Sequence, residues 1–589
     1  MKHFQSFLLL LSLTLFFSCR KNFSDETFTP VVTPVIPDFA PKSTASVSGF
    51  VTDANGNPVF NAQVVAGNKQ TVTDGYGYFF IEDAQLNKAA GLIKIVHGSY
   101  YTSYRSFTVN EGKTSFTRIQ LLSKTVTGTV NAAAGGTVTT TDGAKVELPA
   151  DAVIVASNGA AYNGTIKIAS KWIDPTVVSN FQSATPGDNR GVNSDGHLVY
   201  TKSHAVIAVE LSGDIDQKLQ IAAGKKATIT IPIPASIAAT APASIALWSF
   251  DETTACWKQE STATKTGNTY VGQVSHFSYW EGAIGLPLVN FTARVLNSSL
   301  QPLSNVPVVI TQANVPQNAG YGKFGYTDMD GYVYGVIPAN MNLVLDVMTT
   351  CATTAYSVPF STTNSNIDLG AVTGNAGQST VTIAGTAVNC SNAPVTNGYV
   401  QVYDNGFNNR IPIVNGTFSF TGLACTNTTA SYVVVDNSTN LQSQPQTITL
   451  NAGTNNLGQL TACGTSTIST INYTIDANSY TWTEPARKPA GFYTPQGYTQ
   501  MVGDIMTNAN FSFNFDGGDA LGNGHQLIEV FSPDFAGGRA ISSTPLAVTI
   551  TEFGAPGGFI SGSFSGVMND FVSNTPYNVS FNFRVRRYN

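Results

Sequence analysis

Charged side chains are scarce in this chain of 589 residues. They make up 11% of it, well below the roughly 25% of an average soluble domain. Thirty Lys and Arg stand against 36 Asp and Glu, so the formal net charge is −6. Binding to a nucleic acid backbone relies on an excess of basic side chains, and we therefore expect no nucleic acid partner. The 53 Gly, 34 Phe and 23 Tyr also exclude a coiled coil and a fully disordered chain.

Motifs of the common hydrolases and nucleotide-binding proteins are missing too. The six histidines form no His-Glu-x-x-His pair, and neither a Gly-x-Ser-x-Gly elbow nor a Gly-x-x-x-x-Gly-Lys-Ser/Thr loop occurs. No two cysteines have the Cys-x-x-Cys spacing of a zinc ribbon or redox pair. We therefore predict that the chain is not an enzyme and that it uses no cofactor and no metal.

A long hydrophobic run is absent as well, because no stretch reaches the 18 apolar residues of a transmembrane helix. The shorter run from Phe7 to Phe17 follows Lys2, which predicts a signal peptide over residues 1–18. The residues Leu15-Phe16-Phe17-Ser18-Cys19 resemble a bacterial lipobox. This resemblance implies that Cys19 carries a lipid that includes a palmitate chain, and that this lipid is the membrane anchor.

Residues 19–44 have the composition of a flexible tether. Four prolines lie there among polar residues, and such a segment buries too little apolar surface to fold. Arg20 rather than Asp follows Cys19, so nothing marks retention at the inner membrane. Ser24-Asp25-Glu26 resembles the acidic surface-export signals of some Gram-negative lipoproteins, with a plain solvated linker as the alternative. We predict a protein anchored in the outer membrane and facing the cell exterior.

A pattern of strands and turns recurs three times along the chain. In each copy nine residues separate a strand position from a proline: Gly49 and Pro58, Ala293 and Pro302, Gly385 and Pro394. Each copy then reaches a Gly turn before an aromatic strand, at Asp74-Gly75, Asp330-Gly331 and Asn415-Gly416. Asp-Gly and Asn-Gly favour the positive φ of tight hairpins, so the pattern predicts turns rather than metal or phosphate sites.

These three segments resemble the carboxypeptidase regulatory-like domain, a transthyretin-type β-sandwich of broadly Ig-like shape. The resemblance implies sandwiches over residues 45–124, 286–375 and 376–463 that act as spacers or interaction modules, without peptidase activity. The second copy departs from the pattern in Ala293 and in an insertion around Gly320–Phe324. The predicted fold class is all-β, with tandem β-sandwich modules on the lipid-anchored tether.

Residues 125–285 show another set of strand patterns. Their opening Gly135-Gly136, the element Leu148-Pro149-Ala150-Asp151-Ala152 and the closing His276-Phe277-Ser278 resemble a β-sandwich module of netrin receptors and zonula-occludens proteins. In some proteins with this module a His-Phe-Ser triplet cleaves its own backbone. That resemblance implies Ser278 as nucleophile and His276 as proton acceptor at the Phe277–Ser278 bond. In the alternative interpretation, His276 caps a strand and Phe277 packs in the sandwich.

The last segment, residues 464–589, is predicted to be a further β domain. Its closing strand places Val579, Phe581, Phe583 and Val585 on one face, opposite arginines that either bind an anionic partner or form a solvated face. Its Gly-rich ending resembles C-terminal domains of Gram-negative surface lipoproteins. The loop Asp516–His525 contains acidic residues but lacks the spacing of an EF-hand, so it is predicted to be a Gly-rich loop.

Export permits disulfides among the cysteines that remain after lipidation. The disulfide candidates are Cys351, Cys390, Cys425 and Cys463. Cys425 and Cys463 flank the end of the third repeat, and Cys351 with Cys390 would tie the second repeat to the third; a Cys390–Cys425 pair is the alternative. Cys256, beside Trp257, is predicted to be a buried free thiol.

Three functions remain open on the sequence alone. The first is a structural or adhesive surface lipoprotein, and the second is a glycan- or protein-binding accessory of an outer-membrane uptake system. The third is a self-cleaving module at Phe277–Ser278. Aromatic side chains that would stack on sugars in the second function are Tyr100, Tyr101, Tyr104, Trp482 and Tyr493. Packing in the core or across strands is the other interpretation of these five.

Overall fold

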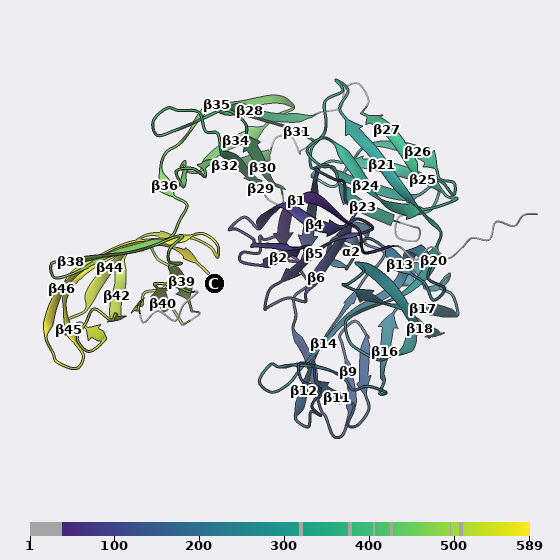
Figure 1. The fold of residues 1–589 in the computed structure, drawn as a ribbon, viewed down its shortest axis with the longest axis horizontal. Helices are drawn as coiled ribbons and strands as arrows, with labels where there is room; N and C mark the ends of the chain where they lie inside the picture. The colour runs from purple at the N-terminus through teal and green to yellow at the C-terminus, as the bar shows by residue number, and fades with distance from the viewer. Residues whose placement is uncertain are drawn as a thin grey trace, which may run out of the picture.

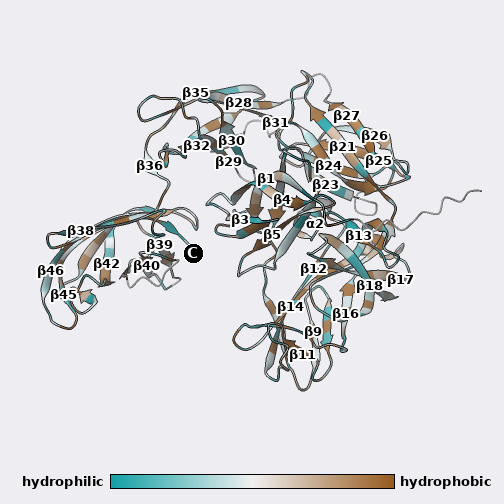
Figure 2. Cartoon of the chain, in the orientation of Figure 1, coloured by the Kyte–Doolittle hydropathy of each residue, from teal (hydrophilic) through white to brown (hydrophobic). Residues whose placement is uncertain are grey.

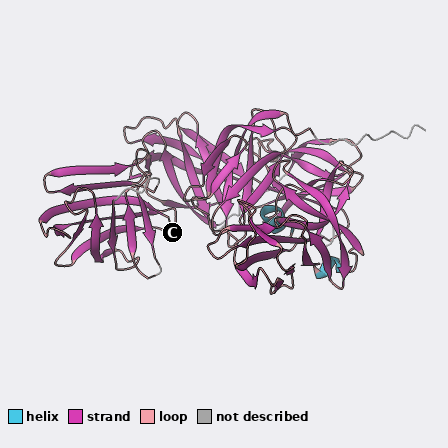
Figure 3. Ribbon diagram, turned by 60° about the horizontal axis from the view of Figure 1, so that its bottom comes forward, coloured by secondary structure: helices cyan, strands magenta, loops and turns pink. Residues whose placement is uncertain are grey.

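The computed structural model describes residues 38–316, 322–374, 380–404, 407–423, 428–494, 496–505 and 511–588. Regular structure in these ranges is almost entirely β (Figure 3), which confirms the predicted all-β fold class. The helices within them are two short ones, α2 (Val178–Ala184) and α3 (Ala235–Ala238). No helix of the described residues is long and apolar enough to cross a membrane. The signal peptide, Cys19 and most of the tether lie outside these ranges.

The first repeat forms a sandwich of two sheets, called here the first module. Its strands are β1 (Lys42–Thr52), β2 (Gln63–Ala66), β3 (Lys69–Val72), β4 (Tyr78–Asn87), β5 (Gly91–Val96), β6 (Ser103–Phe107) and β7 (Thr114–Gln120). One sheet has the order β4-β1-β7 and the other β3-β2-β5-β6. The central strand β1 pairs antiparallel with β4 and parallel with β7. Side chains such as Val47, Val51, Phe79 and Ile95 fill the space between the sheets.

The second repeat module has the same topology, with sheets β24-β21-β27 and β23-β22-β25-β26. Its strands are β21 (Leu288–Leu296), β22 (Pro307–Gln312), β23 (Gly322–Tyr326), β24 (Tyr332–Pro338), β25 (Asn342–Met348), β26 (Thr354–Ser361) and β27 (Ile367–Thr373). Again the central strand, β21, pairs antiparallel with one neighbour and parallel with the other.

The third repeat module is built in the same way, with the sheet β31-β28-β35 facing a sheet around β29 and β32. Its strands are β28 (Val381–Asn389), β29 (Gly398–Asp404), β30 (Phe407–Ile413), β31 (Thr417–Gly422), β32 (Thr428–Asp436), β33 (Leu441–Gln442), β34 (Gln446–Leu450) and β35 (Gly453–Ala462). Three segments that share the nine-residue spacing to a proline therefore share a strand order.

The nine-residue spacing has a common structural cause in the three modules. In each, the proline forms an isolated bridge to the end of the first strand, Thr52–Pro58, Leu296–Pro302 and Val388–Pro394. A glycine with positive φ packs on that proline: a Cβ on Gly77, Gly331 or Gly416 would lie 2.7 to 3.3 Å from the proline Cβ. In the first module this glycine is Gly77, not the expected Gly75.

Residues between the first and second repeats form the large module. Its strands are β8 (Val126–Asn131), β9 (Gly136–Thr139), β10 (Lys145–Leu148), β11 (Val153–Val155), β12 (Thr165–Ile173), β13 (Arg190–Val192), β14 (Leu198–Ser212), β15 (Lys218–Ile221), β16 (Ala227–Pro232), β17 (Ser244–Asp251), β18 (Cys256–Thr266), β19 (Thr269–Val274) and β20 (Tyr279–Leu286). All 13 belong to one sheet. Trp280, Phe277 and aliphatic residues of β14 and β16 lie in its core. Only Pro287 separates β20 from β21, so this module runs into the second repeat module without a linker.

The C-terminal module is one 10-stranded sheet. Its strands are β37 (Thr470–Ile475), β38 (Asn478–Thr483), β39 (Ala490–Tyr493), β40 (Thr499–Val502), β41 (Ser512–Phe515), β42 (Gly522–Phe531), β43 (Arg539–Ile541), β44 (Leu546–Phe553), β45 (Phe559–Asp570) and β46 (Pro576–Arg587). The preceding β36 (Thr465–Ser466) still pairs with β33 of the third repeat module. As the alternation predicts, Val579, Phe581, Phe583 and Val585 all lie in the core.

The modules cluster around the first one instead of forming a line (Figure 1). Apolar residues lie on strands throughout the assembly (Figure 2), and each module has its own buried core. The last module returns to the first: the rings of Phe60 and Tyr588 are 5.1 Å apart. Gly75 and Gly557 approach so closely that a Cβ on Gly75 would lie 2.5 Å from the Gly557 carbonyl oxygen. Two modules at opposite ends of the sequence are therefore neighbours in space.

Candidate functional site

Apolar side chains bind the first module to the large module. Tyr101 of the first module is 2% exposed and packs with Trp248, Trp257 and Tyr279 of the large module. The ring of Tyr104 lies 5.2 Å from that of Phe250. The two modules therefore share one apolar cluster, and burying a single large side chain of this kind contributes about 2 kcal/mol.

Polar contacts cross the same boundary. The Ser106 hydroxyl donates to the Ala255 carbonyl at 2.6 Å, and the Arg105 guanidinium donates to the Gly187 carbonyl at 3.0 Å. Arg190, paired with Asp188 at 2.9 Å, also reaches the Ala89 carbonyl. Because these groups are buried, they fix the orientation of the two modules and not only their distance.

The second repeat module also shares its core with its neighbours. Tyr200 of the large module is 1% exposed there, and so is Leu423 of the third repeat module. Backbone hydrogen bonds from Ser304 to Thr421 and from Thr350 to Leu423 join the second and third repeat modules. Four modules thus form a continuous packed body.

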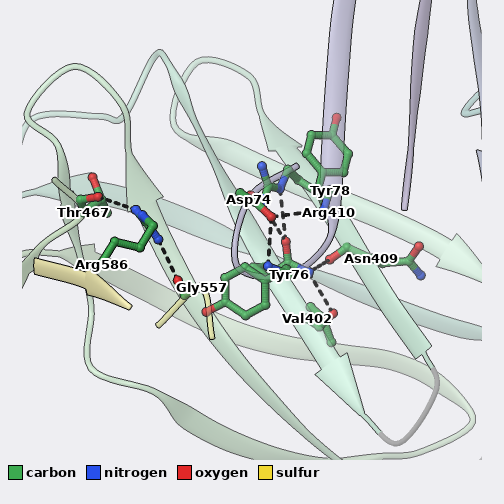
Figure 4. A network of polar contacts seen from close by, with 10 residues as sticks. Asp74, Tyr76, Tyr78, Val402, Asn409, Arg410, Thr467, Gly557 and Arg586 are labelled. Atoms are coloured by element: carbon green, nitrogen blue, oxygen red, sulfur yellow. Dashed lines mark hydrogen bonds and ion pairs between the residues drawn. The ribbon is translucent and has the colours of Figure 1, made fainter. Parts of the chain in front are cut away.

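One ion pair joins the first and third repeat modules at the centre of this body. The Arg410 guanidinium lies 2.5 Å from the Asp74 carboxylate (Figure 4). It also lies over the rings of Tyr78 and Tyr399, 3.9 and 3.8 Å from their centroids. Gln401, fully buried, accepts from the Arg410 Nε at 3.1 Å. Burial alone lowers the pKa of Arg410, but the Asp74 carboxylate and the two phenols outweigh it, so the pKa is raised.

The turn that carries Asp74 explains its position. Its Oδ1 accepts hydrogen bonds from the Tyr76 and Tyr78 amides at 2.9 and 3.0 Å, which leaves Oδ2 for Arg410. The side chain that orders the hairpin of the first module is therefore also the one that binds the third.

Next to this ion pair, the outer face of the sheet β4-β1-β7 carries aromatic side chains. The strand register aligns Phe80, Ser48 and Phe116 in one row across the three strands. A second row holds Tyr78, Phe50 and Arg118. Successive residues alternate faces, so the inward neighbours Phe79 and Ile119 fill the sandwich core while these two rows face the other modules.

Above these rows lies a cleft of about 700 Å³. Phe50, Tyr78, Phe80 and Phe116 form its floor, and Tyr399, Arg410 and Pro412 of the third repeat module form one wall. The second repeat module contributes Asn305 and the turn Asp328–Asp330. Phe80 is 44% exposed and Met329 is 38% exposed, so part of the apolar lining is open to solvent. The cleft exists only because three modules meet.

A smaller cavity of about 100 Å³ lies nearby, where β7, α2 and β23 meet. Cationic side chains dominate its lining, and their partial burial lowers the pKa of Lys323 to about 8 and that of Arg105 to about 10. Burial alone raises the pKa of Asp188, but Arg190 and Lys323 hold it below its usual value. Lys323 also connects the second repeat module to the large module, because it donates to the Asp188 carbonyl at 2.5 Å.

The His276-Phe277-Ser278 triplet lies immediately before β20, and Phe277 packs in the core as the alternative interpretation expects. Phe277 is buried, and the Gln220 side chain binds both its amide and its carbonyl, at 2.7 and 3.1 Å. The His276 imidazole faces Glu260 at 3.3 Å, and the Ser278 hydroxyl donates to the Tyr279 carbonyl at 3.1 Å. The hydroxyl is thus directed to the Tyr279 carbonyl. For cleavage it would have to attack the Phe277 carbonyl instead.

The disulfide of the third repeat module joins Cys390 to Cys463. Both sequence-based pairings for Cys390, with Cys351 or with Cys425, are therefore wrong. The physical reason is the parallel pairing of β28 and β35, which brings the ends of these strands together. Cys351 is also disulfide-bonded, and Cys425 lies outside the described residues. Cys256 is free and buried as predicted, and burial raises its pKa to about 12.

The five aromatics expected to stack on sugars do not form one exposed patch. Tyr101 and Tyr104 lie at the boundary with the large module, which contradicts their use as an open surface. Tyr100 packs beside His97, Trp482 stacks on Phe511, and Tyr493 meets Phe553 edge to face. All five rings therefore contact another aromatic ring, and Tyr101 is buried.

The arginines of the last strand are not a solvated face either. Arg584 pairs with Glu552 at 3.0 Å, and Arg587 donates to the Gly554 carbonyl at 2.9 Å. Arg586 donates to Thr467 and Gly557 carbonyls, both at 2.8 Å (Figure 4). They hold the C-terminal module against the segment that enters it.

A buried histidine organises the Asp516–His525 loop. Both ring nitrogens of His525 lie within 2.8 Å of carbonyl oxygens, those of Asp516 and Ala520, and Asp516 Oδ1 accepts from the Gln526 amide. Across the described ranges, no three His, Cys, Asp or Glu residues group as a metal site would require.

Sequence reasoning missed the cleft and the ion pair at its edge. The available signal was in β4, where Tyr78 and Phe80 occupy outward positions that a half-exposed strand normally gives to polar residues. Apolar residues on both faces of a strand indicate that both faces are covered.

No protein-family model matches the sequence, and no curated protein matches it. Among solved structures, the shaft pilin SpaA from Lactobacillus rhamnosus GG is 8% identical over 30% of this chain and 98% of its own, with a TM-score of 0.17. A DUF3823 family protein from Bacteroides uniformis is 10% identical over 28% of this chain and 99% of its own, with a TM-score of 0.16. The Bacillus anthracis TIE protein is 8% identical over 66% of this chain and 73% of its own, with a TM-score of 0.14. Function is therefore inferred from the sequence and the geometry of this chain alone.

Proposed function

We propose that the chain is a non-enzymatic, lipid-anchored scaffold of the bacterial cell surface, in which the first module holds the others in one rigid body. The observation that carries this proposal is the burial of side chains across module boundaries, Tyr101, Tyr200 and Leu423 above all. A flexible string of sandwiches would leave such side chains exposed to water, at a cost of about 2 kcal/mol each.

The anchor in this proposal is the lipid on Cys19, which places the scaffold in the outer membrane with its modules outside the cell. Two or more acyl chains give stable membrane attachment, whereas one chain gives marginal attachment. The lipobox-like residues before Cys19 and the proline-rich segment after it support this placement.

The test of the anchor is a Cys19→Ser variant expressed in a Gram-negative host with a clickable palmitate analogue. The wild-type protein should be labelled and should sediment with membranes, and the variant should lose the label and become soluble. A Cys256→Ala variant is the matched control, because it removes another cysteine and leaves the lipid site intact. A Cys19→Ser protein that stays in the membrane fraction would refute the anchor.

A second candidate function is the binding of a surface glycan, and it rests on a different observation, the aromatic cleft between three modules. A rigid scaffold and a binding protein are compatible, since a cleft shared by several modules keeps its shape only if the modules are fixed.

A further inference from the structure

The cleft above the β4-β1-β7 sheet combines an aromatic floor with polar walls. Small-molecule sites typically have volumes of about 300 to 1,000 Å³, with a mostly apolar lining and a few polar groups that set orientation. At about 700 Å³, with four aromatic rings in its floor, the cleft has this character. We propose that it binds a short neutral oligosaccharide.

The charges of the lining argue for a neutral ligand. Its two cations, Lys113 and Arg410, are balanced by its two carboxylates, Asp328 and Asp330. Lys113 pairs with Asp330 at 3.4 Å, and Arg410 is held by Asp74 outside the lining. A strongly charged ligand would have to break these pairs, whereas sugar hydroxyls donate to carboxylates and accept from cations without changing the charge of the site.

The floor argues for recognition by side chains. β1 is the central strand of its sheet, and its backbone groups are already paired with β4 on one side and β7 on the other. An extended peptide that adds to a sheet needs an unpaired strand edge. The cleft instead presents the exposed ring of Phe80 and the partly exposed rings of Tyr78 and Phe116, which suit the apolar C–H faces of pyranose rings.

One polar group in the lining has unused hydrogen-bonding capacity. Asn305 is 5% exposed, and its Nδ2 donates to Asn409 Oδ1 at 3.1 Å. Its Oδ1 has no hydrogen-bond partner within the described part of the chain. A buried acceptor without a donor is unfavourable, so a ligand hydroxyl that came close enough to donate to it would favour binding.

This inference deepens the second candidate function and does not depend on the lipid anchor. The experiment uses the purified chain from Lys21 onward and isothermal titration with separate hexasaccharides of glucose (β-1,4 and α-1,4), xylose and mannose, and with hexagalacturonate as the charged probe. At least one neutral hexasaccharide should bind, and hexagalacturonate should bind at least tenfold more weakly.

The variant Phe80→Ala should weaken that binding about tenfold or more, because it removes the exposed ring of the floor. Phe571→Ala is the matched control: Phe571 is 55% exposed but lies in the C-terminal module, and its variant should bind like the wild type. A near-ultraviolet circular dichroism spectrum of each variant checks that the modules remain packed.

Three outcomes with the sugars would overturn the proposal. They are failure of every neutral hexasaccharide to bind, tighter binding of hexagalacturonate, and binding that Phe80→Ala leaves unchanged. Phe80-dependent binding of an extended peptide in place of the sugars would also overturn it. A Cys19→Ser protein that has left the membrane should still bind the sugar. Sugar binding is therefore tested independently of the lipid anchor.

Discussion

Arg410 and Asp74 form an ion pair at 2.5 Å although 336 residues separate them in the chain. The arginine side chain is 12% exposed and the aspartate 33%, so the pair lies between a buried and a surface salt bridge. It connects the first and third repeat modules at the edge of the aromatic cleft. Its neighbours, Tyr78 and Tyr399, belong one to each of these modules.

Removing one partner of this pair should loosen the contact between the two modules. We expect Arg410→Met to lower stability by about 2 to 3 kcal/mol, because it leaves Gln401 and Asp74 without their donor, and Asp74→Asn to cost less. A double-mutant cycle by urea unfolding should give a coupling energy of about 1 kcal/mol or more, after allowance for the exposure of Asp74. Additive effects of the two substitutions would contradict a direct interaction.

Glu281 should make the large module less stable at neutral pH than in mild acid. Its side chain is fully buried on β20, with Ser203 donating to Oε2, and burial raises its pKa to about 7. Because the folded state holds the proton more tightly than the unfolded state, this contribution is complete below about pH 4.5 and is lost as the pH rises to about 7.

A Glu281→Gln variant should therefore gain up to about 3 kcal/mol over the wild type at pH 8, from 1.36 kcal/mol per pKa unit, and almost nothing at pH 4. Thermal unfolding of both proteins at the two pH values measures the difference. An equal change in melting temperature at pH 4 and pH 8 would rule out a titrating Glu281.

The Cys390–Cys463 disulfide should stabilise the third repeat module. It closes a loop with a sequence separation of 73, for which chain entropy predicts about 4 kcal/mol at most. We expect Cys390→Ser with Cys463→Ser to lower the free energy of unfolding by about 2 to 4 kcal/mol in urea. As a control, Cys351→Ser should leave the Cys390–Cys463 peptide detectable by mass spectrometry, and loss of that peptide would mean that the pairing is different.

The wild-type chain should remain intact at Phe277–Ser278. The Ser278 hydroxyl is held by the Tyr279 carbonyl and the His276 imidazole by Glu260, so neither is directed at the Phe277 carbonyl. A denaturing gel after several days of incubation should show one full-length band for the wild type and for Ser278→Ala alike. Two fragments from the wild type, absent in Ser278→Ala, would establish self-cleavage.

The local fold could be predicted from sequence because its causes are local. A strand, a proline nine residues later and an Asp-Gly or Asn-Gly turn each restrict the backbone directly, and three copies of that pattern produce three copies of one topology. The alternation of Val579, Phe581, Phe583 and Val585 likewise fixes which face of β46 is buried.

Contacts between modules could not be predicted, because they depend on which outer faces meet. No residue near Asp74 in the sequence indicates that it pairs with Arg410. Likewise, the sequence around Tyr101 does not distinguish it from an exposed aromatic residue, because its burial depends on contact with Trp248 and Trp257 of another module. The prediction of the disulfide pairing failed for the same reason. The ends of β28 and β35 meet through a parallel pairing, and the spacing of the cysteines does not predict that pairing.

The most direct test of the rigid scaffold is the distance between the first and third repeat modules in solution. Val72 and Val414 are 52% and 63% exposed, and each is replaced by a spin-labelled cysteine for pulsed electron paramagnetic resonance. A single rigid body should give one narrow distance distribution, which Arg410→Met broadens. A broad distribution in the protein with Arg410 intact would contradict the claim that the modules form a single body.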